Sequence, residues 1–248
     1  MHHGAASPPS DGGCRAVVMP GQEAEPVTMT RLVTARLRLD PVAGFTGTDG
    51  ADGTDGDDRA GGTDVAALFA LHADPRAFVE DSTAPLTSPA QMRWVLREWC
   101  RDWERHGIGH FTVRALQPDP GLTADERAAS TASGSEAPLP AGLLGVVGLS
   151  PMEVAGTEVL SAYWRLDPRV TGRGVATEAM HAVLDRFTTD HSPAEHADRE
   201  IIAVTAAGNT ASLALAARLG FRPAPSVRPV PGGREGDVLL VLARTGES

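Results

Sequence analysis

Residues 159–177 form an apolar stretch that passes through a glycine-containing turn directly into an amphipathic helix. Such a succession places a helix N-terminus at the end of a strand. The first N–H groups of a helix lack carbonyl partners and the helix dipole makes that end positive, so a phosphate is favoured there. Gly172 and Gly174 allow a positive φ and a close approach of a ligand to the backbone. The sequence therefore predicts an anion site at this turn.

The helix that follows the turn is predicted to be half buried, because its apolar and polar residues fall on opposite sides. The apolar residues at helical spacing are Val175, Ala176, Ala179, Met180, Val183, Leu184 and Phe187. A Walker loop is excluded because no lysine lies near the turn, and a dinucleotide fingerprint fails because Thr177 stands where Gly or Ala is required. A helix start whose glycines serve only to turn the chain stays open.

The pattern Arg169-x-x-Gly172-x-Gly174 resembles the pyrophosphate loop of the GNAT superfamily of acyl-CoA-dependent N-acyltransferases. The strand before it resembles the central strand of that fold. The resemblance implies an α+β fold with a mixed, mostly antiparallel central sheet that is splayed at the cofactor site and has helices on both faces. It also implies acetyl-CoA as acyl donor.

Three further segments agree in order and spacing with the RimJ/RimL-type branch (ribosomal-protein N-acetyltransferase-like). Residues 200–206 have strand composition, and a short helix follows, which Asn209 can cap and Gly220 can end. Its N-x-x-S…L-G-F pattern resembles the last helix motif of that branch. The half-exposed strand in residues 30–42 resembles the first strand, and residues 144–151 resemble a mid-domain strand. The resemblance covers residues 30–42, 65–116 and 142–244.

Composition predicts one domain with loose additions. Residues 1–28 are expected to be a disordered tail, and residues 29–248 a single acetyltransferase domain with loose inserts at 43–64 and 117–140. About 175 residues remain for the folded body, which suits one domain. Met29 is a plausible natural start, with Met1 as the alternative.

The net charge of −10 gives no evidence of a cationic partner, because the three loose segments carry −2, −5 and −3 and the folded remainder is neutral. No nucleic-acid surface is expected. The Asp-rich insert lacks calcium-loop spacing, and Cys14 and Cys100 give neither a disulfide framework nor a metal site. The expectations are therefore no metal, no membrane span and a cytoplasmic protein, as a monomer or a homodimer.

A helix opening at Ser88-Pro89 places Met92, Leu96, Trp99 and Trp103 on one stripe, which is interpreted as core. An aromatic wall of the acceptor site, formed by Trp94 or Trp103, is the alternative. The family resemblance places the acceptor pocket beside the loop that precedes this helix.

The resemblance implies a set of site residues. The backbone edge of residues 163–166 would hold the pantetheine arm, residues 169–177 the pyrophosphate, and Asn209 the thiol end. The cofactor-binding set is Tyr163, Trp164, Arg165, Leu166, Arg169, Val170, Thr171, Gly172, Arg173, Gly174, Val175, Ala176, Thr177, Asn209 and Ser212.

The catalytic groups are less clearly marked. Ala216 stands where many family members have a tyrosine acid, so Ser212 is the predicted acid, with a packing role as the alternative. Glu158 is the predicted base, with Glu80 and Asp81 as alternatives, although carboxylates in such positions are more often ordinary surface charges.

The predicted function is transfer of an acetyl group from acetyl-CoA to a primary amine by direct attack in a ternary complex. Lack of an obvious base favours an α-amine of a protein or peptide, because an α-amine with a pKa near 7.7–8.0 is already partly neutral. A small-molecule amine acetyltransferase (antibiotic or metabolite), a longer acyl donor and a non-catalytic acyl-CoA-binding module stay open.

Overall fold

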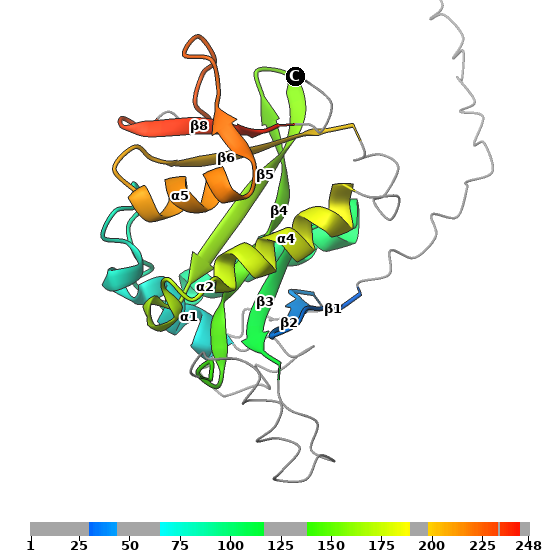
Figure 1. Cartoon of the computed structure of the whole chain (residues 1–248), viewed down its shortest axis with the longest axis vertical. Coiled ribbons are helices and arrows are strands. Elements are labelled where there is room, and N and C mark those ends of the chain that lie inside the picture. Colours follow the sequence, from blue (N-terminus) through cyan, green and yellow to red (C-terminus); the bar gives the residue numbers. More distant parts are fainter. Residues whose placement is uncertain (1–29, 44–64, 117–137, 189–197, 233, 244–248) are drawn as a thin grey trace, which may run out of the picture.

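A single eight-stranded sheet runs through the protein in the computed structural model, which describes residues 30–43, 65–116, 138–188, 198–232 and 234–243 (Figure 1). Its strand order is β1-β2-β3-β4-β5-β6-β8-β7, and every neighbouring pair is antiparallel except β5 with β6. The strands are β1 Leu32–Val33, β2 Leu37–Pro41, β3 His110–Ala115, β4 Leu143–Val154, β5 Thr157–Leu166, β6 Glu200–Ala206, β7 Phe221–Pro223 and β8 Asp237–Leu242. The expected α+β fold with a mixed, mostly antiparallel sheet is confirmed.

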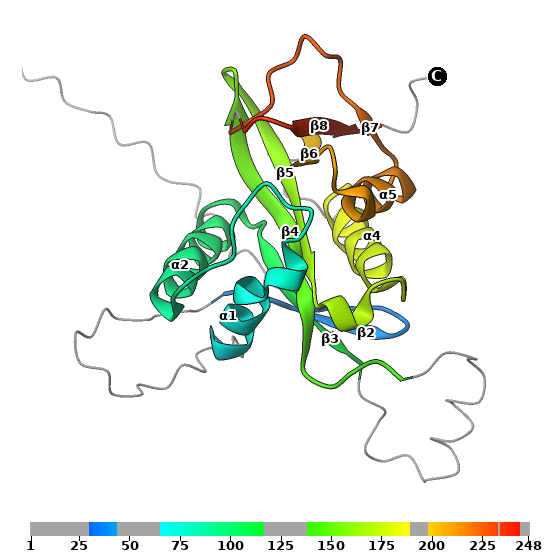
Figure 2. The same ribbon diagram turned by 90° about the vertical axis from the view of Figure 1, so that its left-hand side faces the viewer.

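Helices cover both faces of the sheet, as Figure 2 shows: α1 and α2 lie on one face and α4 and α5 on the other. The helices are α1 Val65–Ala73, α2 Pro89–His106, α4 Val175–Thr188 and α5 Thr210–Arg218, with short 3₁₀ turns η2 Pro75–Ala77 and η3 Pro168–Val170. Most of the predicted loose segments lie outside the described residues: the 1–28 tail, residues 44–64 and residues 117–137.

Local sequence explains why α2 begins and ends where it does. Ser88 caps it in a capping box with Gln91, Pro89 occupies its first turn, and Gly107 ends it in the left-handed conformation at φ 65°. The stripe of Met92, Leu96, Trp99 and Trp103 is buried, as predicted. Trp103 packs edge-on against Phe111 with ring centroids 5.0 Å apart, whereas Trp94 is 58% exposed. Trp103 is therefore a core residue.

Strand β4 carries two glycines because its neighbours lie very close. A Cβ at Gly145 would lie 2.6 Å from the backbone oxygen of Arg165, and one at Gly148 would lie 2.5 Å from that of Gly109. These contacts explain the glycines of the segment at residues 144–151, which the sequence marked only by family resemblance.

The feature that positions the site is the separation of β5 from β6. The two strands pair in parallel only where residues 159–161 face residues 200–202. Beyond Ser161, β5 stays paired with β4 through Leu166, while β6 stays paired with β8 through Ala206. Residues 162–166 therefore have no strand partner on the β6 side within the described part of the chain. This open edge presents backbone N–H and C=O groups to a ligand.

Candidate active site

The turn between β5 and α4 has the geometry of an anion cradle. Asp167 caps η3 by accepting a 2.8 Å hydrogen bond from the backbone N–H of Arg169. Gly172 and Gly174 then adopt φ angles of 75° and 72°, which only glycine takes readily. The first hydrogen bond of α4 runs from the Glu178 N–H to the Gly174 oxygen, at 3.0 Å. The N–H groups just before Glu178 therefore lack intrahelical partners and can bind an anion.

The two glycines of the turn serve different purposes. A Cβ at Gly172 would meet no atom within 4 Å, so the backbone there borders open space. A Cβ at Gly174 would lie 3.3 Å from the Arg36 guanidinium. Gly172 therefore marks the side from which a diphosphate can approach, and Gly174 the side that packs against the protein. The residues present fit a diphosphate group.

Residues from the N-terminal segment brace the start of α4. Glu178 accepts hydrogen bonds from the Thr34 hydroxyl at 2.6 Å, the Arg36 N–H at 3.0 Å and the Arg36 Nε at 2.8 Å. Arg36 Nη2 also donates to the backbone oxygen of Arg173 at 3.0 Å. Burial raises the pKa of Glu178, but the hydrogen bonds from Thr34 and Arg36 outweigh burial and lower the pKa overall. We call these three residues, Thr34, Arg36 and Glu178, the loop brace.

Arg169 lies at the outer edge of the turn. Its side chain is 55% exposed and its Nη2 lies 2.7 Å from Asp167 Oδ2. The hydrogen bonds and charge of Asp167 raise the pKa of the Arg169 guanidinium. An exposed cation beside the open face of Gly172 suits a phosphate ligand.

Ser212, Asn209 and Trp164 come together beside the open edge of β5. Asn209 caps α5, its Oδ1 accepting a 2.9 Å hydrogen bond from the Ser212 N–H. Ser212 Oγ in turn accepts a 3.1 Å hydrogen bond from Trp164 Nε1. Because the indole can only donate, the Ser212 O–H is left to point elsewhere. Ala216 is 1% exposed and supplies no acid.

Glu158 lies far from this group, which removes the support for its predicted role as base. It sits at the hairpin end of β5, 70% exposed on its side chain, and its Oε2 is 2.7 Å from Arg199 Nη2. Trp164 follows six residues later on the same extended strand, a span of about 20 Å. The sequence could not place Glu158, because its position depends on where β5 parts from β6.

The side chains of Tyr163 and Arg165 point to the opposite face from Trp164, so their predicted cofactor role can involve only their backbone. Arg165 Nη2 lies 2.6 Å from Asp81 Oδ2, Nη1 donates to the Ala77 oxygen at 2.7 Å, and Nε donates to Tyr163 Oη at 3.1 Å. The guanidinium also stacks on the Phe78 ring, 3.7 Å from its centroid. Arg165 therefore fixes the α1–α2 connection, residues 74–88.

The two alternative bases of that connection differ in environment. Asp81 is bound by Arg165, and although burial raises the pKa of its carboxyl, the hydrogen bonds from Arg165 and Thr83 lower it overall. Glu80 Oε2 accepts a 3.4 Å hydrogen bond from Thr210 at the start of α5. The α1–α2 connection thus reaches the end of α5 that carries Ser212.

A buried histidine is held neutral on this face. His72 Nδ1 lies 2.8 Å from the Leu68 oxygen and Nε2 lies 3.0 Å from Tyr163 Oη. Because a carbonyl only accepts, Nδ1 carries the proton and Nε2 accepts from the tyrosine. Burial, together with the Arg165 charge, lowers the pKa of His72 to about 4, against the opposing effect of the Leu68 hydrogen bond.

We expect a pH-dependent stability from His72. Its pKa is lower in the folded state than in the unfolded chain, so the unfolded chain takes up the proton first as the pH falls from 6.5 toward 4. The free energy of unfolding should therefore fall by about 2 kcal/mol between pH 7 and pH 5 from this residue alone. Urea denaturation at both pH values measures the fall. His72→Gln should reduce it and the exposed control His181→Gln should not; an unchanged fall in His72→Gln contradicts the assignment.

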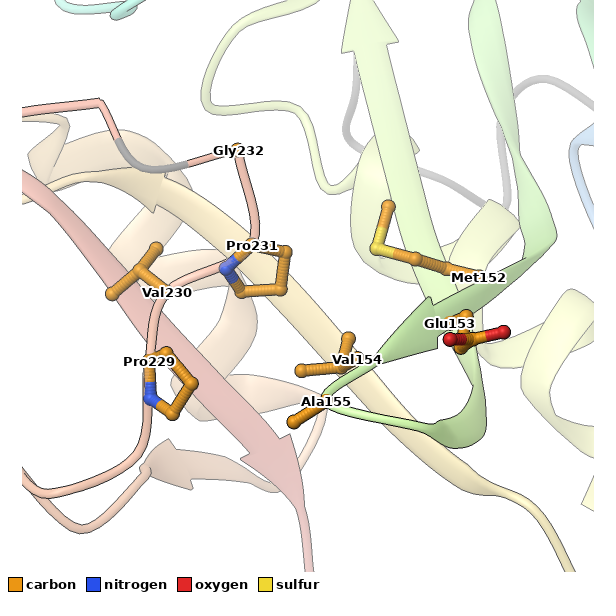
Figure 3. Close-up of a pocket in the computed structure, with 8 residues that line it drawn as sticks. All are labelled: Met152, Glu153, Val154, Ala155, Pro229, Val230, Pro231 and Gly232. Carbon is orange, nitrogen blue, oxygen red and sulfur yellow. The ribbon is translucent and has the colours of Figure 1, made fainter.

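A separate cavity of about 370 Å³ lies between the β4–β5 hairpin and the loop before β8 (Figure 3). Its lining residues are Met152, Glu153, Val154, Ala155, Pro229, Val230, Pro231 and Gly232. It is at the other end of β5 from Gly172, and Glu153 is the only charged residue among its described lining residues. It therefore does not belong to the anion cradle.

Membrane-spanning helices and metal-binding clusters are both absent from the described residues. No helix there has the length and apolarity to cross a membrane, and no group of three or more His, Cys, Asp or Glu side chains there could hold a metal ion.

Solved structures share the fold at low sequence identity. An acetyltransferase from Agrobacterium tumefaciens has a TM-score of 0.56 at 20% identity, covering 90% of this chain and 100% of its own. RimL, a ribosomal L7/L12 α-N-protein acetyltransferase in complex with coenzyme A, has a TM-score of 0.52 at 15% identity and covers 85% and 94%. MccE, a microcin self-immunity acetyltransferase in complex with acetyl-CoA and AMP, has a TM-score of 0.52 at 12% identity and covers 84% and 92%.

Family membership rests on a sequence model. No curated protein matches the chain in sequence. The model of the acetyltransferase (GNAT) domain matches residues 60–222, more than half of the chain, and this span includes the open edge of β5, the glycine turn and α5. The chain therefore belongs to the GNAT acetyltransferase family.

Proposed function

We propose that this protein is an acetyl-CoA-dependent N-acetyltransferase of the RimJ/RimL-type branch, acting on the α-amine of a protein or peptide. One observation carries the proposal: the open backbone edge of residues 162–166 leads directly into a glycine turn whose outer face, at Gly172, is unobstructed. An extended pantetheine arm followed by a diphosphate matches this sequence of features.

Different groups of the chain would bind different parts of acetyl-CoA. The N–H groups ahead of Glu178 and the guanidinium of Arg169 would hold the diphosphate, and the loop brace would keep the turn in place. The edge of β5 would pair with the pantetheine amides. The thiol end would then lie toward Asn209 and Ser212. Bound acetyl-CoA supplies an activated acetyl group.

The same groups can assist the transfer. A backbone N–H near Trp164 on the open edge can donate to the thioester oxygen, where negative charge develops during attack. Ser212 can give its proton toward the departing sulfur, because its oxygen already accepts from Trp164 and its O–H is directed away from the indole. Trp164 thus orients the hydroxyl of Ser212.

We expect Ser212→Ala to lower turnover by on the order of 10²-fold, because it removes the proton donor, while acetyl-CoA affinity changes little. Steady-state kinetics and calorimetry measure the two quantities. Ser212→Thr is the matched control, since it keeps the hydroxyl and should retain most activity. Equal activity of the alanine variant would leave Ser212 a packing residue that only satisfies the Trp164 N–H.

The choice of an α-amine rests on chemistry and on fold likeness. An α-amine with a pKa near 7.7–8.0 loses its proton far more readily than a lysine side chain with a pKa near 10.4. Two of the candidate bases, Glu158 and Asp81, form ion pairs with arginines, so a readily deprotonated acceptor is favoured. The RimL structure, a ribosomal-protein α-N-acetyltransferase, shares the fold.

A peptide with a free N-terminus and an internal lysine tests this choice. After incubation with the protein and acetyl-CoA, tandem mass spectrometry locates the acetyl group. We expect it on the α-amine, and no product from the same peptide with a blocked N-terminus. Product on lysine alone, or only on small amines such as aminoglycosides, would contradict the α-amine and favour the other acceptor class.

A further inference from the structure

One buried carboxylate lies outside the groups assigned to acetyl-CoA binding and to acetyl transfer. The side chain of Asp237, at the start of β8, is 2% exposed. Its Oδ1 has no hydrogen-bond partner among the described residues. Its Oδ2 lies 4.0 Å from Arg234 Nη1, beyond hydrogen-bond distance. A buried carboxylate oxygen without a donor is costly, so its presence calls for a partner that binds from outside.

The backbone places Asp237 next to the segment that leads into α5. Asp237 pairs with Ala206, the last residue of β6. The Ala207 N–H donates to the Gly236 oxygen at 2.7 Å, and the Asn209 N–H donates to the Ala206 oxygen at 2.9 Å. Backbone hydrogen bonds therefore join the start of β8 to the segment that ends at Asn209, the cap of α5.

Side-chain alternation gives the face on which Asp237 lies. Asp237 and Leu239 share one face of β8, and Leu239 belongs to the same buried cluster as Val159 of β5. Val159 shares a face of β5 with Tyr163 and Arg165, since the register of β5 against β4 is unbroken. That is the face covered by α1, α2 and their connection, opposite to the face on which Trp164 meets Ser212.

Two contacts bring the connection between α1 and α2 to this end of the sheet. Arg234 Nη1 donates to Ser82 Oγ at 3.3 Å, and Thr210 donates to Glu80 at 3.4 Å. Residues 80–82 therefore join the loop before β8 to the start of α5. Asp237 pairs with the end of β6 that has separated from β5, and the loop before it is joined to residues 80–82.

We infer that the Asp237 carboxylate binds the ammonium group of the acceptor and takes one proton from it. This inference rests on the proposed function. The proton passes from nitrogen to a carboxylate oxygen, and the free amine attacks the thioester carbonyl carbon. The C–N bond forms, the C–S bond breaks, and the second nitrogen proton goes to the departing sulfur through Ser212. The products are the amide and the free thiol, and Asp237 returns its proton to water.

The weak basicity of the Asp237 carboxylate limits which class of amine can be the acceptor. A carboxylate is a weak base, so it can deprotonate an α-ammonium group with a pKa near 7.7–8.0 at a lower cost than a lysine near 10.4. Asp237 therefore strengthens the proposed preference for an α-amine, because its carboxylate can form an ion pair with the α-ammonium group before it takes the proton.

Asp237→Asn tests the inference, because it keeps the shape and removes the charge. With the free-N-terminus peptide, we expect kcat/KM for the amine to fall at least about 100-fold. The acetyl-CoA dissociation constant should not change. The thermal midpoint should stay the same or rise, since the charge is removed from a buried carboxylate that has one oxygen without a hydrogen-bond donor. Glu235→Gln, an exposed carboxylate two residues earlier, is the matched control and should behave as wild type.

The possible outcomes separate this inference from the function on which it rests. An Asp237→Asn protein as active as wild type overturns the inference alone. A lower thermal midpoint together with lost acetyl-CoA binding would give Asp237 a structural role and overturn it as well. A wild-type protein that releases no thiol overturns the proposed function and this inference together.

Discussion

Gly172→Glu is expected to lower the affinity for acetyl-CoA at least about 100-fold, or about 3 kcal/mol. The new side chain would enter the open space above Gly172, which no protein atom occupies within 4 Å of a Cβ. Its carboxylate would meet a diphosphate there and repel it, at the positive end of α4. Calorimetric titration of the purified variant with acetyl-CoA measures the loss.

Gly156→Glu is a close control for this substitution. Gly156, at the β4–β5 hairpin, has a φ of 80°, close to the 75° of Gly172, and a Cβ there also meets no atom within 4 Å. Both variants therefore carry similar backbone strain and the same added charge. We expect Gly156→Glu to bind acetyl-CoA as wild type does. Equal affinity of the two variants would show that the turn at Gly172 does not hold the diphosphate.

Arg165→Met is expected to lower the free energy of unfolding by about 3 kcal/mol. This value is at the lower end of the usual cost of breaking a buried ion pair, because Asp81 is partly exposed. The side chain of Arg165 is 9% exposed and that of Asp81 is 22% exposed. Methionine would leave Asp81 without its cation and Tyr163 without a donor. Although burial raises the pKa of Asp81, the hydrogen bond and charge of Arg165 help to lower it, so the loss should be greatest at neutral pH, where Asp81 is ionised, and smaller at low pH. Urea denaturation at pH 7 measures it.

The same substitution should separate acceptor binding from donor binding. Arg165 holds the α1–α2 connection, so the KM for the amine should rise, while acetyl-CoA affinity should change little. Arg101→Met removes an arginine whose pair with Glu98 is 49% and 41% exposed, and it should alter neither quantity. Lost acetyl-CoA binding with an unchanged amine KM in Arg165→Met would place this side chain on the donor side instead.

Sequence patterns predicted the features of the site that depend only on residues close together in the sequence. The glycine turn before α4 follows from strand and helix periodicity and from the rarity of positive φ in other residues. Asn209 caps α5 and Ser88 caps α2, as their spacing indicated. The tryptophan stripe of α2 is core because its residues recur at helical spacing.

Features that depend on long-range pairing could not be predicted. Nothing in residues 159–166 marks Ser161 as the last residue of β5 to pair with β6, so the sequence could not show that Glu158 lies away from Ser212. The contact between Arg36 and Glu178 joins residues 142 positions apart. An acidic residue in the first turn of a helix was the only local signal for it, and the helix dipole alone explains that preference.

Asp237 was also missed. A single carboxylate after a glycine-rich loop resembles a surface charge in the sequence, whereas in the structure the Asp237 side chain is only 2% exposed. The N-x-x-S…L-G-F motif ends at Phe221, so it marks no residue of β8.

The central claim is that this chain transfers an acetyl group, and release of free thiol from acetyl-CoA tests it most directly. Purified protein would be mixed with acetyl-CoA, with and without the free-N-terminus peptide, and the thiol followed with a chromogenic disulfide. We expect release that needs both protein and peptide and that is lost in Gly172→Glu. Tight binding of acetyl-CoA without release under any amine would contradict catalysis and leave an acyl-CoA-binding module.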